Sequence, residues 1–166
     1  MNPPPPRDDE TRAILDGIRH VVRVLRTSAR AAEARTGVSA AQLFALLRLA
    51  QAPKLSLGAL ADHTLTHPSS VSVVASRLVA RGLVARRRAR DDARRIELTV
   101  TPAGRRVLRR TPVLAQDRLV TAIGTLRPGD RRALARGLRA LLASLGVGHR
   151  PPAMFFEDGK ARDGDR

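Results

Sequence analysis

The feature that most constrains the fold is the stretch from Leu55 to Gly104, where two short helical patterns precede two strand patterns. A turn separates the helical patterns, and a polar, arginine-rich link joins the strand patterns. Between Arg77 and Arg110 the chain has twelve arginines and three acidic residues, a local charge of +9. A short helix pair beside a cationic hairpin fits a DNA duplex, with one helix in the major groove and one loop at the backbone or minor groove. The stretch therefore predicts a fold that binds double-stranded DNA.

The composition of the whole chain narrows the class of partner. The 166 residues carry a formal net charge of +16, which favours polyanions, meaning nucleic acid or an anionic membrane surface. The chain has three phenylalanines and no tryptophan or tyrosine. Because binders of single strands usually stack bases on aromatic side chains, we expect duplex DNA rather than single strands.

Several other classes are disfavoured by what the sequence lacks. Without cysteine, the chain has no disulfide or thiolate metal ligand. His63 and His67 have a spacing that can hold zinc, but the predicted turn falls between them, so we expect no metal site. No nucleophile and base stand out as a pair, so we expect neither an enzyme nor a cofactor. No apolar run approaches the ~20 residues of a membrane span, and no signal-peptide pattern is present, so we expect a cytoplasmic protein.

The hydrophobic periodicity predicts four helices before the strands. The first covers about residues 9–35 and the second about 39–50. A short third helix starts at Ser56, and after a turn around residues 63–66 a fourth helix runs to Gly82. Each boundary has a capping or breaking residue. The start signals are a capping box from Ser39 to Gln42, Ser56, and either Thr66 or His67 before Pro68; the stop signals are Gly37, Pro53 and Gly82.

The second half of the chain predicts two strands and two helices. The strands cover 83–88 and 95–100, with Ile96, Leu98 and Val100 on one face. Thr101 caps a helix that Pro112 should kink or break, and a last helix runs from about 128 to 146. The order α-α-α-α-β-β-α-α predicts a mainly α fold with a small β-hairpin.

The chain divides into five segments on this basis. Residues 1–8, with four consecutive prolines, predict an extended or disordered lead-in. Residues 37–101 form the predicted DNA-binding lobe. The helices of 9–36 and 102–146 carry apolar stripes that need partner surfaces, so we expect them to pair with each other and with a second subunit. In the tail, 147–166, the segment Met154–Phe156 is apolar enough to dock on that subunit, although a disordered end is an equal alternative.

The helix pair carries residues suited to a base-reading surface. Short hydroxyls near the start of the fourth helix contact phosphate well and read several bases weakly, whereas arginine reads guanine through two hydrogen bonds. The alternative is that the serines only cap a helix and favour turns. The contacts expected from the helix pair are Ser56, His67, Ser69, Ser70, Ser72 and Arg77.

The link between the strands supplies a second expected contact. Asp92 stands two residues before Arg94, where its carboxylate could hold the guanidinium in place. An arginine held in this way can enter a narrow A·T minor groove, where the negative potential is strongest. The alternative is a solvated cationic hairpin. The neighbouring residues that we expect to favour phosphates are Arg86, Arg87, Arg88, Arg90 and Arg95.

Taken together, these residues resemble the MarR-type winged helix-turn-helix transcription regulators over about residues 10–145. The matching segments are Gly37–Gln42 (GVSAAQ), Leu55–Ala61 (LSLGALA), Ser69–Ser72 (SSVS), Arg81–Val84 (RGLV), Asp92–Arg95 (DARR) and Leu98–Gly104 (LTVTPAG). The resemblance implies an obligate, triangular homodimer that binds a pseudo-palindromic operator, with dimerisation helices flanking the lobe. It also implies that Arg94, supported by Asp92, is the minor-groove residue. Ala93 replaces a common second arginine of this motif, for which Arg90 or Arg95 could substitute.

The resemblance further implies a repressor that a small anionic or phenolic ligand releases from DNA. Such a ligand would lie between the dimer helices and the lobe, where His20, Arg23 and Arg48 are candidates by position. The alternative is that these three are ordinary surface residues. The leading hypothesis is therefore a sequence-specific, dimeric regulator, and its alternative is a nucleoid-type protein that coats DNA through charge alone.

Overall fold

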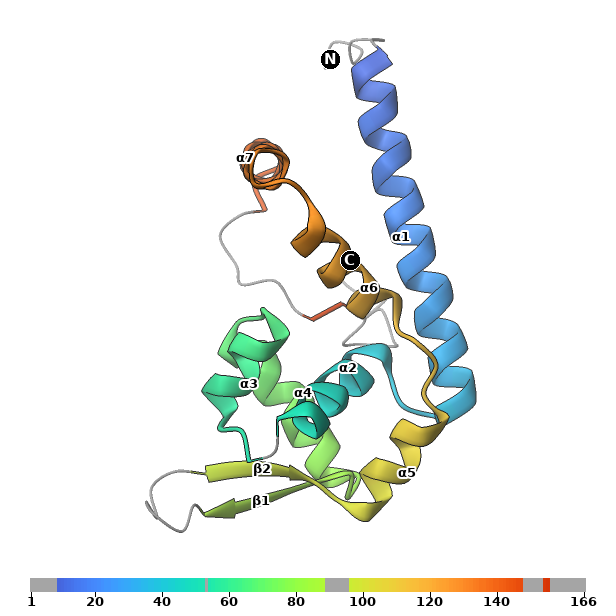
Figure 1. Ribbon diagram of the computed structural model, residues 1–166, viewed down its shortest axis with the longest axis vertical. Helices are drawn as coiled ribbons and strands as arrows, with labels where there is room; N and C mark the ends of the chain where they lie inside the picture. Colours follow the sequence, from blue (N-terminus) through green and yellow to red (C-terminus); the bar gives the residue numbers. More distant parts are fainter. Residues whose placement is uncertain (1–8, 53, 89–95, 148–153, 156–166) are drawn as a thin grey trace, which may run out of the picture.

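The computed structural model describes residues 9–52, 54–88, 96–147 and 154–155, and Figure 1 shows their arrangement. The fold is mainly helical with one antiparallel hairpin, as the sequence predicts. The elements are α1 (Asp9–Thr36), α2 (Ala40–Gln51), α3 (Leu57–Thr64), α4 (Pro68–Ala80), β1 (Val84–Arg88), β2 (Ile96–Val100), α5 (Pro102–Arg110), α6 (Ala115–Thr125) and α7 (Pro128–Ser144). The order differs from the prediction by one helix, because the segment after β2 forms both α5 and α6.

The predicted helix starts are confirmed by their capping hydrogen bonds. The hydroxyl of Ser39 accepts from the backbone N–H of Gln42 at 3.4 Å, and that of Ser56 accepts from Ala59 N at 3.1 Å. For α4 the cap is His67 rather than Thr66, since its Nδ1 accepts from the N–H of Ser69 at 3.3 Å. These local bonds fix the entry of each helix of the lobe.

The core of the lobe lies between the helices α2, α3 and α4 and the hairpin. Among its fully buried side chains are Phe44, Leu60, Val71, Leu78 and Leu98. The hairpin has a regular register, with Val84 opposite Val100 and Arg88 opposite Ile96. Ile96 lies on the strand face predicted for Leu98 and Val100, but it is 51% exposed whereas Leu98 is buried.

The position of Ile96 in the hairpin explains its exposure. It is the first described residue of β2, at the end of the hairpin that projects away from the helices (Figure 1). Leu98, two residues further on, is held against the lobe, because its N–H donates to the carbonyl of Leu55 at 2.8 Å. The apolar face of β2 is therefore covered only where the helices reach it.

The junction between β2 and α5 is tightly built. The hydroxyl of Thr101 donates to the carbonyl of Gly82 at 2.7 Å and caps α5 by accepting from Gly104 N at 3.1 Å. Gly104 packs so closely that a Cβ built on it would lie 2.3 Å from the carbonyl oxygen of Leu83. This contact fixes α5 against the end of β1.

The predicted break at Pro112 is confirmed. Helix α5 ends at Arg110 and α6 begins at Ala115, whose N–H donates to the hydroxyl of Ser28 at 2.9 Å. That bond brings α6 against α1. Figure 1 shows α1 extending past the lobe, with its N-terminal end far from the hairpin.

The two terminal helices leave their apolar stripes uncovered. Helix α7 buries none of its residues, and within the protomer α1 packs against α6, which belongs to the same predicted segment 102–146. The exposed apolar residues on α1 are Ile14, Leu15, Ile18, Val21, Val22 and Val24, and those on α7 are Leu134, Leu138, Leu141 and Leu142, followed by Leu145. Within the described segments, no helix has both the length and the apolar character needed to cross a bilayer.

One residue of the C-terminal tail belongs to the core. Met154 is only 3% exposed and joins the hydrophobic cluster of the lobe, while Phe155 is half exposed. The sequence analysis expected this segment either to dock on a second subunit or to be disordered. Met154 does neither, because it packs within its own chain. Phe156, the third apolar residue of the segment, lies outside the described residues.

Candidate nucleic-acid interface

Helix α4 presents one polar face outward. Its opposite face, carrying Val71, Val74 and Leu78, is buried in the lobe. The turn before it is held by the N–H of Thr66, which donates to the carbonyl of Ala61 at 3.0 Å, and Leu65 takes the left-handed conformation there. The geometry is that of a helix-turn-helix with α4 as the second helix.

Most of the predicted contacts of the helix pair lie on accessible surface. His67, Ser69 and Arg77 are exposed, and Ser56 and Ser72 are partly buried. Ser70 differs, because it is buried at the edge of the apolar face of α4. Its position leaves its hydroxyl little surface for a DNA contact, and we remove it from the interface.

The sequence interpretation missed Ser76. This residue is exposed on the same face of α4 as Ser69 and Ser72, at helical spacings of three and four residues. Its hydroxyl accepts a hydrogen bond from Nη2 of Arg86 at 2.9 Å, which ties β1 to α4. The helical spacing of Ser69, Ser72 and Ser76 in the sequence was a sufficient signal to find it.

The hairpin adds positive charge beside α4. Arg86, Arg87 and Arg88 are all exposed on β1. In the described segments, neither Arg86 nor Arg88 forms an ion pair, so their charges are available to phosphates. The predicted contacts in the link between the strands, Arg90, Asp92, Arg94 and Arg95, lie outside the described residues and stay predictions.

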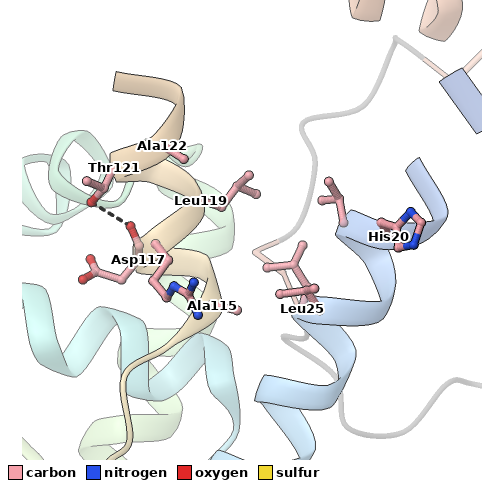
Figure 2. Close-up of a pocket in the computed structure, with 10 residues that line it drawn as sticks. His20, Leu25, Ala115, Asp117, Leu119, Thr121 and Ala122 are labelled. Carbon is pink, nitrogen blue, oxygen red and sulfur yellow. Dashed lines mark hydrogen bonds between the residues drawn. The ribbon is translucent and has the colours of Figure 1, made fainter. Parts of the chain in front are cut away.

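A cleft of about 550 Å³ lies between α1 and α6, and Figure 2 shows its lining. His20 and Leu25 line it from α1, and Asp117 and Leu119 line it from α6. Its walls are largely apolar, and its polar groups include an imidazole and a carboxylate. Such a composition suits a small organic molecule.

The three predicted ligand residues have different positions relative to this cleft. His20 lines it, and Arg23 is exposed on α1 outside its lining. Arg48 reaches it indirectly, because its Nη2 pairs with the carboxylate of Asp117. The sequence interpretation did not identify Asp117, which is 69 positions from Arg48 and could not be paired with it by any local pattern.

Arg48 is held by several groups at once. Its Nη1 donates to Oε1 of Gln51 at 2.8 Å, and its guanidinium lies 4.7 Å from the centroid of the Phe44 ring. Among the described residues, its Nε is buried without a hydrogen-bond partner, as is Oε1 of Gln116, which precedes Asp117 in α6. Arg48 therefore links α2 of the lobe to α6 beside the cleft.

The described segments contain no group of three or more histidine and acidic side chains placed to hold a metal ion. His63 and His67 lie on opposite sides of the α3–α4 turn, and the ring of His67 is engaged at the start of α4.

Comparison with known proteins shows what the lobe is similar to. Residues 36–95 match the model of the MarR family. A comparison with curated proteins gave no match. Among solved structures, Sco3205, a MarR family transcriptional regulator from Streptomyces coelicolor in complex with DNA, is 22% identical with a TM-score of 0.58. The match covers 89% of this chain and 98% of that one.

Two further solved structures share the fold. BpsR of Bordetella bronchiseptica, whose DNA binding is regulated by 6-hydroxynicotinic acid, is 24% identical with a TM-score of 0.55, over 84% of this chain and 97% of that one. The transcriptional regulator BldR from Sulfolobus solfataricus is 21% identical with a TM-score of 0.53, over 84% of this chain and 99% of that one. At these identities the likeness is one of fold.

Proposed function

We propose that the protein is a homodimeric, sequence-specific DNA-binding repressor of the MarR type, because residues 36–95 match the model of the MarR family and the chain shares the fold of such regulators. Its operator would be pseudo-palindromic, and a small ligand would release it. The observation that carries the proposal is the outward polar face of α4, which lies beside the exposed arginines of β1. The proposed protein acts in the cytoplasm and uses no catalytic step and no cofactor.

The uncovered helices support a dimer. The leucines of α7 are between 39% and 47% exposed, and they follow one another at helical spacing. An apolar stripe of this kind in water marks an interaction surface. A two-fold axis would place the same stripe on both subunits, and it would set the two α4 helices about one helical turn of DNA apart.

The cleft between α1 and α6 supports the ligand part of the proposal. It lies between a terminal helix and the helix that Arg48 joins to the lobe. A molecule bound there would change the position of α6 relative to α2. The proposed ligand is small, with an anionic or phenolic group, and the regulation of BpsR by 6-hydroxynicotinic acid is consistent with this class.

Selection from a pool of random duplex DNA tests the proposed function. We expect the captured sequences to share an inverted repeat and to bind roughly 10³-fold or more tightly than random duplex. Salt dependence alone does not distinguish the hypotheses, because a DNA-coating protein also releases counterions. Captured sequences with no common repeat would contradict a regulator and favour the nucleoid-type alternative.

Substitution of Arg94 tests the predicted minor-groove contact. We expect Arg94→Ala to weaken operator binding by about 1–3 kcal/mol in a fluorescence-anisotropy titration, with the loss largest for operators that carry A·T pairs at the contacted step. Arg12→Ala, which removes an exposed arginine near the far end of α1, is the matched control and should bind like the unmodified protein. Equal affinities of the two variants would remove the role assigned to Arg94.

A further inference from the structure

A second cationic surface lies on α5, apart from α4 and the hairpin arginines. This helix has nine residues, and four of them are exposed arginines. The residues that pack against the lobe are Ala103, Gly104, Val107 and Leu108. The residues on the opposite side, all exposed, are Arg105, Arg106, Arg109 and Arg110, which we call the α5 arginine face.

The charge of the α5 arginine face has no acidic partner in the described part of the chain. Neither ion pair found there includes any of the four arginines. Arg105 donates to the carbonyl of Val100 at 2.9 Å, and Arg106 and Arg110 flank a cavity of about 350 Å³ beside Thr36. No acidic residue occurs in the sequence between Glu97 and Asp117. The positive charge of the four guanidinium groups is therefore available to an external anion, and Arg105 keeps further donors beside the one bonded to Val100.

Close contacts at the start of α5 fix the position of this face. The cap formed by Thr101 and the close approach of Gly104 to the Leu83 carbonyl hold α5 at the base of the hairpin. Figure 1 shows α5 at the end of the hairpin opposite the link between the strands. The α5 arginine face therefore keeps a fixed position relative to α4, and its ordering costs little on binding.

We propose that the α5 arginine face binds the sugar–phosphate backbone of duplex DNA outside the segment that α4 and the hairpin contact. Arginines four residues apart on a helix are separated by about 6 Å along its axis, so the face presents two pairs of forked donors over roughly 7.5 Å of the helix. Contacts to phosphates position a protein without reading sequence. The consequence is a DNA footprint longer than the base-read site. The inference extends the proposed function, but its test does not require sequence specificity.

The experiment compares two variants that lose the same charge. In the test variant the four residues of the α5 arginine face become glutamine. In the control variant four exposed arginines of α1, namely Arg12, Arg19, Arg26 and Arg30, become glutamine. Binding is measured at several salt concentrations on a short duplex with only the selected inverted repeat, and on the same duplex with one helical turn of random sequence added at each end.

The unmodified protein and the control variant should bind the longer duplex more tightly and with a steeper salt dependence. The test variant should lose this gain while keeping its affinity for the short duplex. If two arginines of each protomer contact phosphate, the slope of log K against log salt should fall by roughly 3.6 for the dimer. Hydroxyl-radical footprinting of the unmodified protein should show protection that extends into the added sequence.

Three results would overturn the inference: no gain with length for the unmodified protein, an undiminished gain for the test variant, or an equal loss for the control variant. The footprint decides the question if the test variant fails to fold. If selection returns no inverted repeat, the same comparison is made with random duplexes of the two lengths. The role of the α5 arginine face can therefore be tested even if the protein proves not to be sequence-specific.

Discussion

Leu138→Asp is expected to yield a folded monomer that has lost most of its affinity for the operator. Leu138 is 47% exposed in the protomer, and α7 buries none of its residues, so the new carboxylate costs the isolated chain little. In the proposed dimer the same carboxylate would be buried without a partner, which is strongly unfavourable. Loss of the second subunit should reduce operator affinity by about 10²–10⁴-fold, because the two half-sites no longer share one binding event.

Light scattering after gel filtration gives the oligomeric state of this variant, and circular dichroism gives its fold. Arg136→Asp is the control, since it places a carboxylate on the same helix, opposite the leucine stripe, and should leave the dimer intact. A Leu138→Asp protein that stays dimeric would show that α7 lies outside the interface. A variant that is monomeric and unfolded would show that the protomer depends on its partner for stability.

Gly104→Ala is expected to have the largest effect on stability. The added Cβ would lie 2.3 Å from the backbone oxygen of Leu83 and 2.8 Å from Cγ1 of Val100. Since a backbone atom cannot rotate away, α5 must shift from the hairpin, and the capping bond from Thr101 is strained with it. Overpacking of this kind costs about 3 kcal/mol, a large part of the roughly 5–15 kcal/mol by which proteins are stable.

Thermal unfolding measures this loss, with an expected decrease in Tm of roughly 6–12 °C for a chain of this size. Gly58→Ala is the matched control, because Gly58 lies in α3 and a Cβ there would meet nothing within 4 Å. That control should gain about 0.4–1 kcal/mol from the reduced entropy of the unfolded chain. Equal Tm values for the two variants would contradict the close contact between α5 and β1.

Features with local causes were predictable from the sequence. The caps at Ser39, Ser56 and Thr101 depend on hydrogen bonds within three residues, and the break at Pro112 depends on a missing backbone donor and ring sterics. The burial of Ser70 was also accessible, since a helical wheel places it beside Val74 on the inward face. The predicted inward face of α4 is confirmed by the burial of Val71, Val74 and Leu78. The predicted set of DNA contacts on this helix included one residue of that inward face, Ser70.

Features that depend on distant partners were not predictable. The ion pair of Arg48 with Asp117 joins segments that share no repeat or motif. The start of helix α6 is held by a hydrogen bond from Ala115 N–H to the hydroxyl of Ser28, which is 87 positions away in the chain. No local pattern predicts this bond. No local pattern distinguishes an apolar tail residue that packs on its own lobe from one that packs on a partner, and Met154 does the former.

The burial of Met154 also bears on how the protein is made and handled. Val38 and Phe44 emerge early in synthesis, but the hydrophobic cluster to which they belong includes a side chain that is translated more than a hundred residues later. The core of the nascent lobe therefore lacks one of its side chains until Met154 has been synthesised. A shortened version that stops after α7 would keep this gap permanently, so shortened versions designed for crystallisation should retain residue 154.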